Sequence, residues 1–129
     1  MDHPIVMKIL KEGINSVNLS MLDESARKRI LGEVGDKLYK ENKIEEAVEI
    51  LSKANDIDKL TKMGDDFMMQ GKGEFAALCY LPTKDSQRLS SAAVLCINAK
   101  NYRLAAHAYE AAENRQMADF IRQNFVEAQ

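Results

Sequence analysis

Apolar residues recur along the chain at the three- and four-residue spacing of amphipathic helices. Residues 31, 34, 35 and 38 lie on one helical face, and residues 47, 50, 51 and 54 lie on another. Short polar or glycine-containing turns separate these faces, which predicts antiparallel helix hairpins. The predicted helices span residues 21–41, 44–55, 57–70, 74–81, 86–99, 102–113 and 115–126.

The first 20 residues lie outside this pattern. A short helix is predicted from His3 to Lys11, followed by a loop over residues 15–20. Ser20 is the predicted N-cap of the next helix, with Asp23 three residues later in a weak capping box. Pro82 is expected to end the helix before it early or to kink it, because proline lacks the backbone N–H.

The same kinds of residue return every 29 positions, so that the chain aligns on itself at this offset. One column is small and predicts close helix crossings, because a glycine inside a helix costs about 1 kcal/mol relative to alanine and needs a packing reason. Another holds Asp or Asn and predicts N-caps for the following helices. The columns are Leu31, Leu60, Leu89 and Ala118; Val34, Met63, Ala92 and Ile121; Leu38, Phe67, Cys96 and Phe125; Gly35, Gly64 and Ala93; Ala47, Ala76 and Ala105; Leu51, Tyr80 and Tyr109; and Asp56, Asp85 and Asn114.

This order of bulky and small positions resembles the tetratricopeptide (TPR) helix hairpin. The residues that match it in full are Leu31, Val34, Gly35, Leu38, Ala47, Leu51 and Ala54. The 29-residue period departs from the 34 residues of that family. It is similar to the hairpin spacing of clathrin heavy-chain-type and coatomer-type α-solenoids, as is the style of the stretch from Asn101 to Ala112. The resemblance implies a scaffold for protein binding.

The resemblance also implies the fold: all-α, a right-handed α-α superhelix (TPR-like solenoid) of about three hairpins plus a C-terminal capping helix. Ala118, Ile121 and Phe125 would give the last helix an apolar face opposite a polar one, so we expect the array to end there. The expected divisions are an irregular segment over 1–20, a repeat domain over 21–129, units over about 27–55, 56–84 and 85–113, and the capping helix over 114–126.

In TPR-like arrays the first helix of each hairpin lines a concave groove, and the resemblance places the binding site there. The residues that flank the small column would line it: Asp36, Tyr39, Lys40, Asp65, Met68, Met69, Val94, Ile97 and Asn98. Several of them, including Met68 and Val94, are apolar although they lie off the core columns, which suits an amphipathic helix or an apolar peptide. Three occupants stay open: the N-terminal segment of the same chain, a second copy in a homodimer, and a protein or peptide partner.

Composition narrows the function classes. The chain has 129 residues, with 18 Lys and Arg against 20 Asp and Glu and a formal net charge of −2. A charge near zero disfavours nucleic acids and anionic membranes as partners. With no apolar run near the roughly 20 residues of a membrane span and no visible signal peptide, we expect a cytoplasmic protein. The basic run over residues 27–29 keeps an RNA-associated helical-repeat protein as the alternative function.

The sequence offers little for catalysis or metal binding. His3 and His107 have no Cys or carboxylate at ligand spacing, so no metal site is predicted. Cys79 and Cys96 fall in apolar columns and are expected to be buried small hydrophobes. Residues 71–73 lack the preceding strand and the following Ser or Thr of a phosphate loop, and are interpreted as a hairpin turn. We therefore expect no enzyme activity and no cofactor.

Overall fold

The computed structural model describes residues 3–126, and this part of the chain contains eight α-helices and no strand. It confirms the predicted all-α class. Three hairpins plus a capping helix account for only seven of these helices, and α1, the short N-terminal helix, is the eighth. The helices are α1 (Pro4–Glu12), α2 (Glu24–Lys40), α3 (Ile44–Lys53), α4 (Ile57–Met69), α5 (Gly73–Tyr80), α6 (Ser86–Asn98), α7 (Tyr102–Ala111) and α8 (Arg115–Asn124).

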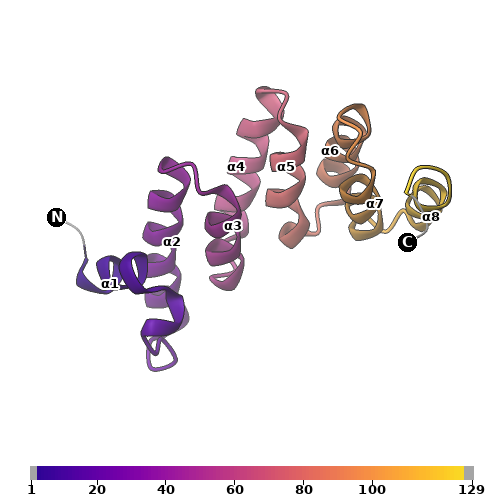
Figure 1. Ribbon diagram of the computed structural model, residues 1–129. Helices are drawn as coiled ribbons and strands as arrows, with labels where there is room; N and C mark the ends of the chain where they lie inside the picture. Colours follow the sequence, from indigo (N-terminus) through magenta and orange to yellow (C-terminus); the bar gives the residue numbers. More distant parts are fainter. Residues whose placement is uncertain (1–2, 127–129) are drawn as a thin grey trace. The chain divides into compact units, whose positions relative to one another are not determined.

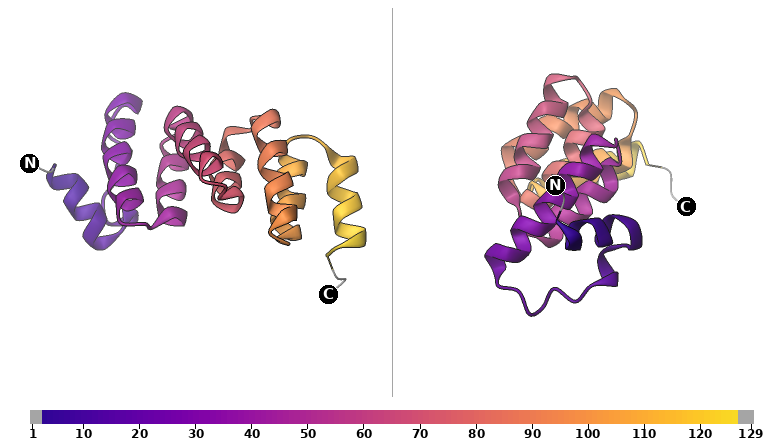
Figure 2. Two further views of the ribbon diagram at one scale, coloured as in Figure 1. Left: turned by 90° about the horizontal axis from the view of Figure 1, so that it is seen from above. Right: turned by 90° about the vertical axis from the view of Figure 1, so that its left-hand side faces the viewer.

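The chain divides into two compact units between Lys59 and Leu60, just inside α4. In the first unit α1 packs against α2 and α2 against α3 (Figure 1). In the second, α5 packs against α6, α6 against α7 and α7 against α8 (Figure 2). Neighbouring helices thus pack together within each unit, as a helical repeat requires. The predicted boundaries at residue 20 and between repeat units stay predictions, and residues 127–129 of the predicted repeat domain over 21–129 lie outside the described part.

The 29-residue period is present in the backbone itself. At the hairpin turns, Asn42, Gly71 and Lys100 have positive φ angles of 63°, 73° and 63°. One residue further on, the backbone N–H donates to the carbonyl five residues back in all three turns, from Lys43 to Leu38 in the first of them. A second set of positive φ angles, at Asn55, Lys84 and Glu113, follows the second helix of each hairpin. A left-handed residue followed by this hydrogen bond is a common way to satisfy the last carbonyls of a helix, so the predicted turns are confirmed.

The Asp and Asn residues of the capping column are N-caps in the structure, as predicted. The Oδ1 atoms of Asp56, Asp85 and Asn114 accept hydrogen bonds from the backbone N–H three residues later, at 3.3, 3.1 and 3.2 Å. The prediction for Ser20 is wrong. Asp23 is the N-cap of α2, with its Oδ1 2.7 Å from the N–H of Ala26, so the helix begins three residues later than the predicted residue 21. A carboxylate also complements the helix dipole, which a neutral hydroxyl does not.

The end of α5 fits the expectation for Pro82. The helix stops at Tyr80, and Leu81–Thr83 form a single 3-10 turn before Lys84 adopts the left-handed conformation. Proline is tolerated in such a turn because its missing N–H is not needed there.

The small column is confirmed as the place where paired helices cross. A Cβ atom built on Gly35 would lie 2.6 Å from Leu51 Cδ2, and one on Gly64 would lie 2.3 Å from Tyr80 Cε1. Both distances are shorter than carbon atoms tolerate, so each glycine admits the bulky residue sixteen positions later. Leu60 and Leu89, from the neighbouring column, are fully buried.

One core prediction is wrong, at Phe125. Ala118 and Ile121 are buried as expected, but the Phe125 side chain is 48% exposed. The reason is that α8 ends at Asn124, and Phe125 leaves the helical path with a φ of −126°. Its ring instead stacks on Tyr102, with the ring centroids 4.9 Å apart. Phe120, 52% exposed, interrupts the polar outer face expected for this helix.

Candidate functional site

The residues predicted to line a groove fall on the first helix of each hairpin. Asp36, Tyr39 and Lys40 lie on α2 in the first unit, while the other six lie on α4 and α6 in the second. Met69 is 87% exposed and Val94 is 48% exposed, so both apolar side chains are accessible. A groove that runs across both units stays a prediction.

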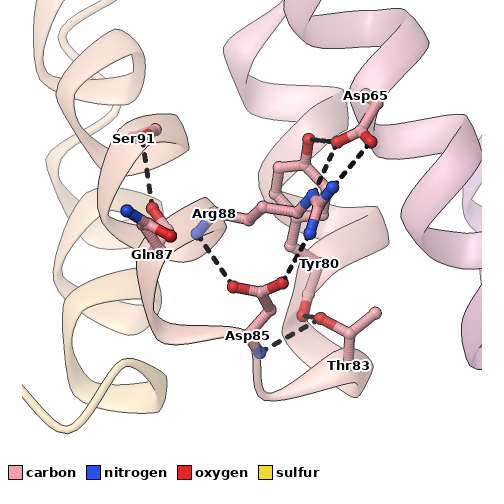
Figure 3. A network of polar contacts seen from close by, with 7 residues as sticks. All are labelled: Asp65, Tyr80, Thr83, Asp85, Gln87, Arg88 and Ser91. Carbon is pink, nitrogen blue, oxygen red and sulfur yellow. Dashed lines mark hydrogen bonds and ion pairs between the residues drawn. The ribbon is translucent and has the colours of Figure 1, made fainter.

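In the second unit, three helices bring polar side chains together (Figure 3). Asp65 of α4 accepts a hydrogen bond from the Tyr80 hydroxyl of α5 at 2.5 Å. Arg88 of α6 binds the same carboxylate in a bidentate manner, with Nε 2.8 Å from Oδ1 and Nη2 3.0 Å from Oδ2. Its Nη1 atom also lies 2.8 Å from Oδ2 of Asp85. Arg88 therefore links two carboxylates, and we call these four residues the Asp65–Arg88 network.

Local sequence features hold this network in position. Gly64 lets the Tyr80 ring cross α4 closely, which brings the hydroxyl to the adjacent Asp65. Asp85 caps α6 by accepting from the Arg88 N–H, so the same residue fixes the start of the helix and the guanidinium. Thr83 ties the preceding turn down, accepting from the Asp85 N–H at 3.2 Å and donating to the Tyr80 carbonyl at 2.6 Å.

The electrostatics of the network favour a fixed charge pattern. The hydrogen bonds from Arg88 and Tyr80 lower the pKa of Asp65 below its ordinary value of 3.8. Burial and the neighbouring Asp65 carboxylate raise the pKa of Tyr80 above its ordinary value. At neutral pH, Asp65 is therefore an acceptor and Tyr80 a donor. A carboxylate so stabilised is a weak base.

A hollow of about 410 Å³ opens beside the network, lined by Asp65, Met68, Tyr80, Gln87, Arg88 and Ser91. Two of the predicted groove residues, Asp65 and Met68, thus share one hollow. The sequence analysis missed the four others. A signal for Arg88 was present: Asp36 and Lys59 stand 23 positions apart, as do Asp65 and Arg88, and the two pairs are offset by 29.

The first unit contains the equivalent ion pair. Lys59 Nζ lies 2.6 Å from Asp36 Oδ2 and 3.4 Å from the carbonyl oxygen of Gly32. One period beyond the Asp65–Arg88 network, the sequence places Val94 and Met117 at the two corresponding positions. The two ion-paired positions of the first two repeats are therefore apolar residues in the third. Phe120, at the position that corresponds to Ser91, extends this apolar character.

The two cysteines and two histidines have structural surroundings. Cys79 and Cys96 are fully buried, and burial raises the pKa of the two thiols to about 12 and about 11. His3 caps α1, with its Nδ1 accepting from the Ile5 N–H, and His107 is exposed on α7. Within residues 3–126, no group of three or more His, Cys, Asp or Glu side chains is arranged to hold a metal ion. No helix in that range has the length and apolar character to cross a membrane.

Comparisons with protein-family models, curated proteins and solved structures find no match for this chain.

Proposed function

We propose that this protein is a non-catalytic interaction module that binds a helix or peptide of a partner protein on the face formed by α4 and α6. We further propose that its hairpins form a TPR-like superhelix with the shorter period of clathrin- and coatomer-type solenoids. The recurrence of both turn types every 29 residues supports this arrangement. In such arrays the first helices line the concave binding surface.

The exposed apolar side chains on this face carry the proposal. The Met69 and Val94 side chains are 87% and 48% exposed. The core residues Leu60 and Leu89 of the same two helices are, in contrast, fully buried. Packing of the unit therefore does not require Met69 or Val94. Burying apolar surface contributes about 25 cal/mol per Å², so these side chains favour association. Methionine adapts to irregular apolar partners, which suits a helix or peptide that lies across the face.

The Asp65–Arg88 network adds polar contacts beside the apolar ones. Gln87 and Ser91 line the same hollow and are exposed. An amphipathic segment would place its apolar side chains on Met69 and Val94, and its polar groups over the hollow. Arg88 and Asp65 already satisfy each other, so the pair contributes orientation more than affinity.

A displayed peptide library tests the proposal without knowledge of the partner. We expect selected peptides to carry apolar residues at helical spacing, and we expect Met69→Glu or Val94→Glu to weaken their binding at least about tenfold. Met7→Glu is the matched control, because Met7 is 51% exposed on α1 in the other unit. Peptides that bind both glutamate variants as well as the parent would refute the proposed face.

Homodimer formation is a separate outcome of the same variants. If sedimentation shows a concentration-dependent dimer that Val94→Glu abolishes, the occupant of the face is a second copy. If the protein stays monomeric at all concentrations, self-association is excluded as the role of Val94.

RNA binding is a second candidate, favoured by one observation in the first unit. Lys28 and Arg29 are exposed and share a hollow of about 350 Å³ with Lys59. Glu33 and Asp56 line the same hollow, which lowers its positive potential. A titration with single-stranded RNA at two salt concentrations tests this function, because phosphate contacts weaken steeply as salt rises. Absence of salt-dependent binding, or binding unchanged by Lys28→Glu, would exclude it.

A further inference from the structure

A cavity of about 160 Å³ lies in the first unit where α1 meets α2 and α3. Val6 and Ile9 anchor α1 and are 0% and 3% exposed. Gly13, with a φ of 96°, then turns the chain, so α1 ends before it covers all of the α2 surface. The space left open is lined mainly by aliphatic side chains, including Ile9, Leu10, Ile14, Val34 and Ile50.

The size and lining of the cavity suit one bulky apolar group. This cavity is open to solvent, but its volume is close to that of an enclosed, engineered protein cavity of about 150 Å³ that is lined by Leu, Ile and Phe and binds benzene. Most of the lining side chains are aliphatic and offer water no hydrogen-bond partner, and the carboxylates of Glu46 and Glu49 are the polar side chains of the lining. Filling such a space recovers van der Waals contacts that its walls otherwise lack. A phenylalanine or leucine side chain of a partner has the required volume.

Two carboxylates at the edge of the cavity specify the charge of its occupant. Glu46 and Glu49 lie one turn apart on α3, line the cavity and are exposed. Lys8, the cation one position before the lining residue Ile9 on α1, pairs with Glu12. Among the described residues neither Glu46 nor Glu49 forms an ion pair. An apolar group with a positive charge beside it therefore complements both the walls and the edge.

We infer that this cavity is a second docking site, which takes one bulky apolar side chain from a basic peptide segment of a partner protein. The apolar side chain enters between α1 and α3, and the flanking Lys or Arg residues face Glu46 and Glu49. The site lies wholly in the first unit and does not use Met69 or Val94. A test that fails for the proposed α4 and α6 face therefore does not count against this site.

Methyl NMR spectroscopy of the full chain tests the site with defined peptides. The probe is Ac-Lys-Lys-Phe-Lys-Lys-NH₂, which we expect to shift the methyl resonances of Ile9, Ile14 and Ile50 and to leave those of Ile97 and Ile121 in place. An Ala-centred peptide with the same charge, and a Phe-centred peptide flanked by Glu, should bind much more weakly. Equal binding of the Phe and Ala peptides would overturn the proposal, because charge alone would then explain it.

Substitutions separate the two contributions. Glu46→Gln with Glu49→Gln should weaken the peptide about three- to tenfold, as expected for two exposed ion pairs. Glu45→Gln, on the same helix but outside the cavity lining, is the matched control and should change affinity less than about twofold. Leu10→Phe should fill the cavity and abolish the methyl shifts, and a circular dichroism spectrum like that of the parent would show that it folds. An unchanged affinity in the double variant, or binding of free phenethylammonium with no binding of the peptide, would refute the site.

Discussion

The hairpins α4–α5 and α6–α7 have the same backbone pattern but different contacts at equivalent positions. In α4–α5, Gly64 makes room for Tyr80, whose hydroxyl reaches Asp65. In α6–α7, the corresponding residues are Ala93 and Val94, so Tyr109 has no carboxylate at the equivalent place. The carboxylate that Tyr80 and Arg88 bind on α4 is thus replaced by an exposed apolar side chain at the equivalent position of α6.

This difference shows which positions the fold constrains. Ala93 is fully buried and stays small, because a helix must cross there. Val94 and Asp65 point away from the core, and exchanging one for the other leaves the turns, caps and crossings of the hairpin intact. Surface residues can therefore change from hairpin to hairpin without a change of fold.

The largest effect on stability is expected from Gly64→Ala. This substitution gives α4 the residue that α6 has at the equivalent position, Ala93. The new Cβ would lie 2.3 Å from the buried Tyr80 ring, which cannot move away without displacing its neighbours. We expect the free energy of unfolding to fall by about 2–3 kcal/mol, the range typical of overpacked cores. Urea denaturation followed by circular dichroism measures it.

Gly32→Ala is the matched control for this substitution. A Cβ on Gly32 would meet the end of the flexible Lys59 side chain at 3.3 Å and Asp56 Oδ2 at an ordinary van der Waals distance of 3.6 Å. Alanine should therefore raise stability by up to about 1 kcal/mol through its higher helix propensity. If Gly64→Ala is as stable as Gly32→Ala, the close crossing is not what requires glycine.

A smaller effect is expected from the helix caps, which both hairpins share. Asp85→Ala and Asn114→Ala each remove a side-chain acceptor from a helix start and should cost about 1 kcal/mol of unfolding free energy. Asp85→Ala should cost more, because Asp85 also binds Arg88. Asp85→Asn keeps a capping oxygen and should recover most of the loss. Equal losses in both alanine variants would show that the contact with Arg88 adds nothing.

The smallest effect on stability is expected from Arg88→Met, which introduces the residue type of Met117, 29 positions later. The contacts with Arg88 lower the pKa of Asp65 and Asp85 below 3.8. A lowered carboxyl pKa stabilises the fold above the unfolded pKa, and this stability is lost as pH falls through the folded value. The variant should therefore lose a little stability at neutral pH and vary less with pH below about 4.

Unfolding measurements from neutral pH to acid, at low and high salt, test this expectation. The loss should shrink as salt rises, because the groups are exposed enough for ions to screen them. A pH profile identical to that of the parent would show that Arg88 is without influence on the two carboxylates.

Much of the local structure could be predicted from residue type and spacing. The hairpin turns, the caps at Asp56, Asp85 and Asn114, and the crossings at Gly35 and Gly64 all depend on residues within one repeat. Ser20 and Phe125 were predicted wrongly because both lie at helix ends, where a shift of one to three residues changes the role of a side chain.

The candidate site could be predicted only in part. Met68 and Val94 stood out as apolar residues off the core columns, whereas Tyr80 was assigned to the core and nothing indicated its bond to Asp65. Periodicity identifies the face on which a side chain lies. It does not show that a buried tyrosine is long enough for its hydroxyl to reach a carboxylate on the neighbouring helix.

The sequence by itself determined the all-α class, the 29-residue period and the positions of its turns, because these follow from interactions between residues close in the chain. Only the tertiary structure decided that Asp65, Tyr80 and Arg88 meet, and that α1 ends short of covering α2. Both outcomes depend on the distance and rotation between helices, which the summed packing of many side chains sets. No single segment of the sequence encodes that geometry.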